Sequence, residues 1–164
     1  PGASIPERRW GADRYGEVGT QLQKYGYGVV VVGGKEDIAA GAAIAQGPNC
    51  LNLAGLTSLV ETAAILEQSA LLISGDSGVL HLGVGLGTPT VSLFGPGIAK
   101  KWAPRGPQHV VLSKHLDCSP CTRFGYTQKC PRQAICLQQI SLEMVVDAAL
   151  SLLPNPRIAG ENHL

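Results

Sequence analysis

Residues 71–96 read LLISGDSGVLHLGVGLGTPTVSLFGP and contain a complete strand–turn–helix–strand pattern. The apolar run at 71–73 predicts a buried strand, and the small polar residues at 74–78 predict a turn after it. Apolar residues spread through 79–86 predict a short helix, which Gly87-Thr88-Pro89 ends before a second buried strand at 90–94. A helix that begins at the carboxyl end of a strand offers backbone N–H groups and a positive dipole to an anion. This stretch therefore predicts a phosphate-binding turn.

The same alternation continues on both sides of this stretch. Apolar, partly β-branched runs predict strands at 29–32, 50–53 and 109–112. Helical patterns predict helices at 15–25, 37–46, 59–69 and 141–153, and Ser58 with Glu61 fits a capping box. Strands that alternate with helices in this way predict an α/β fold, a Rossmann-like parallel sheet flanked by helices on both faces. Ligands of such sheets bind at the carboxyl ends of the strands.

Composition limits the classes of function. The chain has 164 residues, of which 45% are hydrophobic and 15% charged, so it can form one globular domain. A net charge of +1 gives no support to nucleic-acid binding or to electrostatic membrane binding. Neither the dinucleotide fingerprint GxGxxG nor the P-loop GxxxxGK[ST] occurs. No secretory signal pattern opens the chain. Because the chain begins with Pro1 and without a methionine, we expect it to be part of a longer protein.

The turn after the strand at 71–73 carries the first candidate site residues. The hydroxyl of Ser77 and the backbone around Gly78 can hold a phosphate, while the carboxylate of Asp76 suits a sugar hydroxyl or a cation better than a phosphate. The alternative, which we weigh equally, is a plain helix N-cap. His81 lies one helical turn on; a buried core histidine is the more common role there, and contact with a ligand is the alternative.

Two further segments carry charged candidates. Glu36 and Asp37 follow the strand at 29–32, where an acidic residue can accept hydrogen bonds from ribose hydroxyls; a first-turn carboxylate that complements the helix dipole is at least as common. Ser4 and Arg8 both precede the first helix, so both can face one phosphate ligand, which we slightly favour; the alternative is a solvated surface run with Trp10 as its anchor.

Four of the five cysteines lie close together in an irregular segment at 113–137. Cys118, Cys121, Cys130 and Cys136 can bind a structural Zn²⁺ ion tetrahedrally, form two disulfides, or remain reduced thiols that pin a loop. The spacing leaves these three alternatives open.

The motifs form an ordered set: Pro1-Gly2-Ala3-Ser4, Arg8-Arg9-Trp10, Gly33-Gly34 with Glu36, Leu56-Thr57-Ser58-Leu59, Asp76-Ser77-Gly78-x2-His81, Gly87-x-Pro89 and Leu93-Phe94-Gly95-Pro96. Their order and spacing resemble glycosyltransferase family 9, the bacterial ADP-heptose:lipopolysaccharide heptosyltransferases. The resemblance spans residues 1–153, and the combination DSGxxH…GxP…LFGP is its specific part.

The resemblance implies a GT-B glycosyltransferase, in which two Rossmann-like halves face a cleft. Residues 1–153 would form the C-terminal half, which binds the nucleotide-sugar donor, and residues 154–164 would form a tail. The acceptor half, with the family's catalytic base, would lie outside this chain, so we expect no transferase activity from the chain alone. Family members have a strand just before the Pro-Gly-Ala-Ser turn. Because that strand is missing here, we expect an unusual sheet arrangement or a mobile N-terminus.

The resemblance also implies which residues contact the diphosphate and the sugar. Ser4 and Arg8 would contact the donor diphosphate, with Arg8 at a position where family members usually carry Lys. Asp76 would contact the heptose, while Ser77 and Gly78 would offer groups to the diphosphate.

At the nucleoside end, the resemblance implies that Glu36 binds the adenosine ribose and that Leu56 and Thr57 line the adenine, while His81 supports the turn at 76–78. The implied reaction moves heptose from ADP-heptose to a lipid A–core acceptor, without a tightly bound catalytic metal. The enzyme would work in the cytoplasm, at the inner face of the inner membrane, as a peripheral protein. Two alternatives remain: another GT-B nucleotide-sugar transferase, and a zinc-stabilised interaction module on a Rossmann-like sheet.

Overall fold

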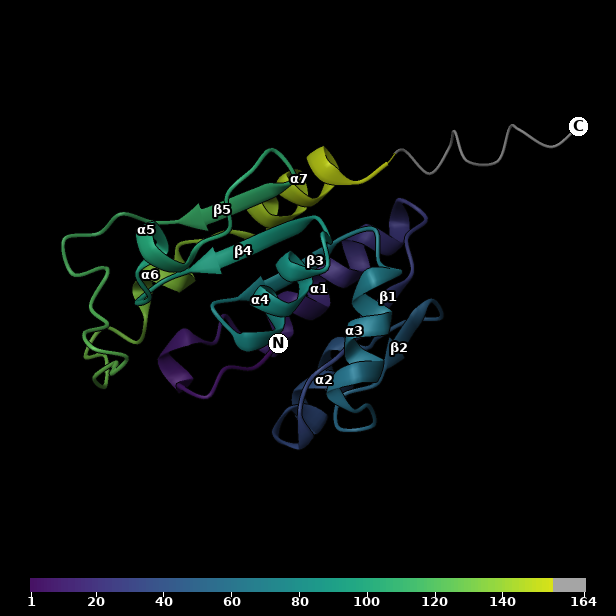
Figure 1. The fold of residues 1–164 in the computed structure, drawn as a ribbon, viewed down its shortest axis with the longest axis horizontal. Coiled ribbons are helices and arrows are strands. Elements are labelled where there is room, and N and C mark those ends of the chain that lie inside the picture. Colours follow the sequence, from purple (N-terminus) through teal and green to yellow (C-terminus); the bar gives the residue numbers. More distant parts are fainter. Residues whose placement is uncertain (155–164) are drawn as a thin grey trace, which may run out of the picture.

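Parallel strands lie between two layers of helices in the computed structural model, which describes residues 1–154 (Figure 1). The strands are β1 (Val29–Val31), β2 (Cys50–Asn52), β3 (Leu72–Gly75), β4 (Thr90–Phe94) and β5 (His109–Ser113). Every strand pairing is parallel, so the predicted α/β class is confirmed. The predicted tail at 154–164 lies, apart from Pro154, outside the described residues.

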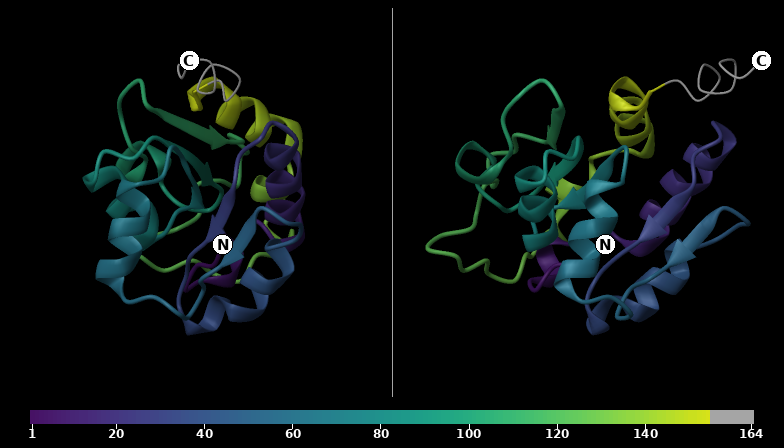
Figure 2. Two further views of the ribbon diagram at one scale, coloured as in Figure 1. Left: turned by 90° about the vertical axis from the view of Figure 1, so that its right-hand side faces the viewer. Right: turned by 45° about the vertical axis from the view of Figure 1, so that its right-hand side comes forward.

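The longer helices are α1 (Ala12–Lys24), α2 (Ile38–Ile44), α3 (Leu59–Glu67), α4 (Gly78–Gly85) and α7 (Leu142–Leu152). Four short ones were not predicted: 3₁₀ helices η1 (Pro6–Arg8) and η2 (Lys35–Asp37), and α5 (Ala99–Trp102) and α6 (Ile135–Gln138). Helices α3 and α4 cover one face of the strands, and α1, α2 and α7 cover the other (Figure 2). No helix within residues 1–154 is long and apolar enough to span a membrane.

The predicted capping box at the start of α3 is confirmed. The Glu61 carboxylate accepts from the Ser58 backbone N–H at 2.7 Å, and the Glu61 N–H donates to Ser58 Oγ at 3.3 Å. Serines begin two other helices in the same way, since Ser77 Oγ accepts from the Leu80 N–H and Ser141 Oγ from the Met144 N–H. These side chains satisfy backbone donors that have no partner in the first helical turn.

The core surrounds β4, all five residues of which are buried. Trp10 joins this core from the N-terminal segment, with 4% of its surface exposed. Its indole N–H donates to the Ile140 carbonyl at 3.1 Å, and its ring meets Tyr15 edge to face at 5.1 Å. Trp10 is therefore the predicted anchor, and it fixes the position of the chain two residues after Arg8.

The strands form two sheets instead of one. β1 pairs with β2 in one sheet, and β3, β4 and β5 form the other, in the order β3–β4–β5. A cavity of about 1050 Å³ separates the two sheets and is lined by residues of both, from 29–32 and from 71–74. The expected unusual sheet arrangement is thus confirmed.

The volume of this cavity can be compared with the space that a strand occupies. The Val29 N–H donates to Asn49 and the Val31 carbonyl accepts from Leu53, so the peptide groups of Val30 point away from β2, toward the cavity. A strand residue fills roughly 160 Å³, from a rise of about 3.3 Å, a strand spacing of about 4.8 Å and a layer spacing of about 10 Å. The cavity is therefore as large as about six residues of one additional strand.

The apolar walls of the cavity lead to a first prediction. The dye ANS, which binds exposed apolar surface, should bind the native chain, and Val30→Glu should weaken this binding because it places a charge in the cavity wall. The measurement is a fluorescence titration at constant protein concentration. Val60→Glu on α3 is the matched control, since Val60 is 79% exposed and outside the cavity lining. An equal loss of dye binding in both variants would contradict the assignment.

Candidate functional site

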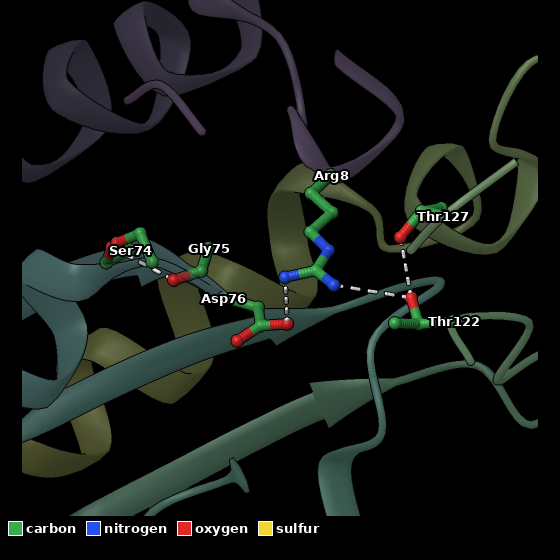
Figure 3. A network of polar contacts seen from close by, with 7 residues as sticks. Arg8, Ser74, Gly75, Asp76, Thr122 and Thr127 are labelled. Atoms are coloured by element: carbon green, nitrogen blue, oxygen red, sulfur yellow. Dashed lines mark hydrogen bonds and ion pairs between the residues drawn. The ribbon is translucent and has the colours of Figure 1, made fainter. Parts of the chain in front are cut away.

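An ion pair between Arg8 and Asp76 lies at the carboxyl end of β3 (Figure 3). Arg8 Nη1 and Asp76 Oδ2 are 3.2 Å apart, and their side chains are only 19% and 9% exposed. Both residues are predicted diphosphate–sugar contacts, and the structure brings them together from positions 68 residues apart in the sequence. Shielding from water makes each of these charges costly without the other.

Asp76 is positioned by the end of β3 and the start of α4. β3 ends at Gly75, and Ser77 begins α4 as its N-cap. Ser77 Oγ also lies 3.0 Å from Ser74 Oγ, which fixes the turn on the strand side. Gly97 packs against the carboxylate so closely that a Cβ there would clash with Asp76 Oδ2. A glycine at this position therefore leaves room for the carboxylate.

Arg8 is held at the end of the 3₁₀ helix η1. The neighbouring Arg9 closes the loop, because its Nε donates to the Ala3 carbonyl at 2.8 Å, and Trp10 anchors the chain immediately after it. Arg8 Nη2 donates to Thr122 Oγ1 at 3.4 Å. Arg8 Nε is buried and has no hydrogen-bond partner among the described residues. A guanidinium with an unused donor fits a site that takes a further acceptor, such as a phosphate oxygen.

The cavity between the sheets connects four of the other predicted donor-binding residues. Ser4, Glu36, Ser77 and Gly78 all line it near the carboxyl ends of β1 and β3. Leu56 and Thr57 are not part of this lining. The Leu56 side chain is 73% exposed, and Thr57 Oγ1 lies 3.0 Å from Thr62 Oγ1 at the start of α3.

The two acidic residues after β1 have different surroundings. Asp37 Oδ2 accepts from the Gly34 N–H at 3.1 Å, so Asp37 stabilises the turn itself. The Glu36 carboxylate is exposed and folds back over Gly34, at the rim of the cavity. Of the two, Glu36 is thus the one whose carboxylate faces solvent at the site.

His81 does not lie in a core, and the common role weighed for it was wrong. The residue is exposed on α4, and its ring meets the Trp102 ring at 6.1 Å between centroids. The His81 backbone N–H donates to the Ser77 carbonyl at 3.5 Å as part of α4, but among the described residues its ring makes no hydrogen bond to the turn at 76–78. The support that the resemblance implies for the His81 side chain therefore has no visible side-chain contact.

Sequence reasoning missed two members of the site, Thr122 and Thr127. Their hydroxyl oxygens lie 2.7 Å apart, both side chains are 7% exposed, and Thr122 accepts from Arg8 (Figure 3). A lone threonine carries no motif, and 114 residues separate Thr122 from Arg8. Nothing in the sequence pattern could have connected them.

The four clustered cysteines do not form a metal site in this structure. Within residues 1–154, no three His, Cys, Asp or Glu side chains are placed together to hold a metal ion, so the predicted Zn²⁺ ligands do not fit the ion as arranged. All four are free thiols. Burial raises the pKa of the Cys136 thiol, and also that of Cys121, where the neighbouring thiols Cys130 and Cys118 contribute in the same direction. Of the three alternatives, the two disulfides are absent, and the role of the thiols stays a prediction.

Comparison with known proteins gives a consistent result. The sequence model of glycosyltransferase family 9 (heptosyltransferase) matches residues 1–131. Lipopolysaccharide heptosyltransferase 2 of Salmonella typhimurium is 36% identical over 103 residues, which are 58% of this chain and 30% of that protein. The chain therefore spans about 30% of the length of the curated relatives it matches.

Solved structures show the same likeness. The structure of E. coli ADP-heptose LPS heptosyltransferase II aligns with a TM-score of 0.77 at 29% identity, over 93% of this chain and 44% of that one. A family 9 glycosyltransferase from Veillonella parvula aligns with a TM-score of 0.75 at 28% identity, over 92% of this chain and 43% of that one.

Thiol chemistry provides the second prediction. Because only the thiolate reacts, and burial both covers the sulfur and raises its pKa, Cys136 should be alkylated far more slowly than the exposed Cys118 at pH 8. Raising the pH should increase the rate at Cys136, because it increases the fraction of thiolate there. Mass spectrometry after timed iodoacetamide treatment measures both rates. Full reactivity of all cysteines in unfolded chain is the control, and one tightly held zinc per chain, with four protected thiols, would contradict the geometry.

Proposed function

The chain belongs to glycosyltransferase family 9, and from this membership we propose that it binds the ADP-heptose donor for transfer of heptose to the lipopolysaccharide core. The support comes from relatives named as lipopolysaccharide heptosyltransferases and from the fold of an ADP-heptose LPS heptosyltransferase. The single observation on which the assignment of residues depends is the shielded Arg8–Asp76 ion pair beside the start of α4.

The diphosphate would lie between Arg8 and the N-terminus of α4. Arg8 brings a fixed positive charge with an unused Nε donor, and the first turn of α4 brings backbone N–H groups and the helix dipole. When the bond from heptose to ADP breaks, negative charge develops on the leaving phosphate. Groups that are already aimed at that charge lower the barrier, since they need no reorganisation during the reaction.

Asp76 would face the sugar. A carboxylate accepts hydrogen bonds from hydroxyl groups, which heptose has and phosphate at neutral pH lacks. Because Asp76 is ion-paired with Arg8, it would lie next to the diphosphate while its own charge is balanced. The assignment therefore puts the sugar–phosphate bond close to the Arg8–Asp76 pair.

The nucleoside would extend along the rim of the cavity toward β1. Glu36, which is exposed there, would accept hydrogen bonds from the ribose hydroxyls, and the exposed Leu56 would offer an apolar surface to the adenine. Ser4, which lines the cavity together with Ser77 and Gly78, would also contact the diphosphate.

The complete reaction also needs an acceptor hydroxyl and a base that removes its proton. In this proposal both would lie in the acceptor half of a GT-B enzyme. Because that acceptor is a lipid, the reaction would take place at the cytoplasmic face of the inner membrane, and peripheral association with the membrane is part of this proposal.

Calorimetry with ADP and with a non-reactive ADP-heptose analogue tests the proposal. Arg8→Ala should weaken both ligands by about tenfold to a hundredfold, the size expected for lost charge-assisted hydrogen bonds. Asp76→Asn should leave the affinity for ADP unchanged, or raise it because a negative charge is removed. The same substitution should abolish the extra affinity that the heptose gives to the analogue. Arg105→Ala, in the exposed loop before β5, is the control for the lost cation.

Two outcomes would count against the proposal. If the folded chain binds neither ligand, it is not a donor-binding domain. If UDP or GDP binds more tightly than ADP, the alternative of another nucleotide-sugar transferase is favoured. Circular dichroism of each variant confirms that a loss of affinity does not reflect unfolding.

A further inference from the structure

The hydrogen bonds around Arg8 continue into the cysteine-rich segment, at 113–137. Arg8 Nη2 donates to Thr122 Oγ1 at 3.4 Å, and Thr122 Oγ1 lies 2.7 Å from Thr127 Oγ1 (Figure 3). A guanidinium only donates, so Thr122 must accept from it. The positive charge favours the rotamer in which the Thr122 hydrogen points away from Arg8 and is donated to Thr127. Each hydrogen bond of this series is thus donated in the same direction, from Arg8 to Thr122 and from Thr122 to Thr127.

A short hairpin brings the two threonines together. Arg123 and Tyr126 exchange two backbone hydrogen bonds, each of 2.9 Å, and so place Thr122 opposite Thr127. The two residues between them have positive φ, 50° at Phe124 and 80° at Gly125, as in the tight turns that join antiparallel strands. The pairing of Thr122 with Thr127 is therefore a consequence of backbone geometry.

The hairpin is in turn fixed to the end of β4. The backbone N–H groups of Cys121 and Thr122 both donate to the Pro96 carbonyl, at 3.1 and 3.0 Å, and Ser119 Oγ donates to the Gly95 carbonyl at 2.5 Å. β4 pairs with β3, which ends at Gly75, one residue before Asp76. Thr122 and Asp76 therefore approach the two terminal nitrogens of Arg8 from segments that are attached to the ends of two paired strands, β4 and β3.

We infer that Thr122, with Thr127 behind it, is a positioning residue that orients the Arg8 guanidinium for the donor diphosphate. Asp76 alone binds one edge of the guanidinium and leaves it able to rotate about its long side chain. A second contact on Nη2 fixes the plane and thereby directs the unused Nε donor. This inference rests on the proposed function, and it gives the cysteine-rich segment a part in donor binding that does not involve its thiols.

The test compares variants of the full chain by calorimetry with ADP. Thr122→Val keeps the shape of the side chain and removes its hydroxyl. It should lower the affinity for ADP about tenfold, as expected for the loss of a hydrogen bond to a charged group. Thr122→Ser restores the hydroxyl and should recover most of the affinity. Thr88→Val is the matched control, because Thr88 is 4% exposed and donates to the Leu66 carbonyl at 2.9 Å, far from Arg8.

A double-mutant cycle separates positioning from stability. If Thr122 acts through Arg8, then Thr122→Val should cause no further loss of ADP affinity in an Arg8→Ala chain. Equal losses with and without Arg8, or full affinity in Thr122→Val, would overturn the inference.

A second measurement needs no ligand, so it decides the inference even if ADP fails to bind and the proposed function falls. Nitrogen-15 NMR reports the rotation rate about the Arg8 Nε–Cζ bond. That rotation should be faster in Thr122→Val than in the wild type, and unchanged in Thr88→Val. An unchanged rate in Thr122→Val would show that Thr122 does not restrain the guanidinium.

Discussion

The pairing of two opposite charges away from water is the constraint around which this site is built. Arg8 belongs to a 3₁₀ helix near the start of the chain and Asp76 to the end of β3, yet their side chains meet at 3.2 Å with little exposure. Removing one member of such a pair leaves the other charge without compensation, which costs several kcal/mol. The segments on both sides must therefore hold their positions. Trp10 and Arg9 do so for Arg8, and the Ser77 cap does so for Asp76.

Much of the fold was predictable because local pattern and burial agree in it. The run at 90–94 is a strand with the predicted bounds, since every residue in it is buried and it lies at the centre of its sheet. The capping box of α3 was equally predictable, because its serine and its glutamate lie within one helical turn. In contrast, α5 and α6 have four residues each, too few to produce a periodic signal.

The candidate site was only partly predictable, for a related reason. The residues of the turn at 76–78 are neighbours in sequence, so their proximity needed no tertiary information. The direction of His81 depended on the rotation of α4, and the partner of Arg8 depended on how a distant loop folds. The separation of β1 from β3 was expected only from the family resemblance. Local pattern predicts strands, whereas the cavity between them depends on which edges find partners.

In the cysteine-rich segment, the cysteines are the conspicuous residues of the sequence, but they are not the residues that contact Arg8. Its spacing invited a metal site, but within the described residues the thiols are not placed as ligands. Cys136 is 5% exposed and packs with Leu137 against Gly95, where a Cβ would lie 3.1 Å from its sulfur. Small side chains permit this close contact with the end of β4. The groups that reach the site are instead hydroxyls of threonines that no motif marks.

An acidic side chain beside a diphosphate is at first a contradiction, because like charges repel. The ion pair resolves it. With Arg8 at 3.2 Å, the carboxylate of Asp76 contributes little net negative charge to an approaching phosphate, and Gly97 leaves the space that this arrangement needs. Arg8 still has its buried Nε donor for the phosphate, and Asp76 still has acceptor capacity for a hydroxyl. In the proposed donor site, one balanced pair would thus bind the two chemically different ends of a sugar–phosphate bond, which neither residue could do alone.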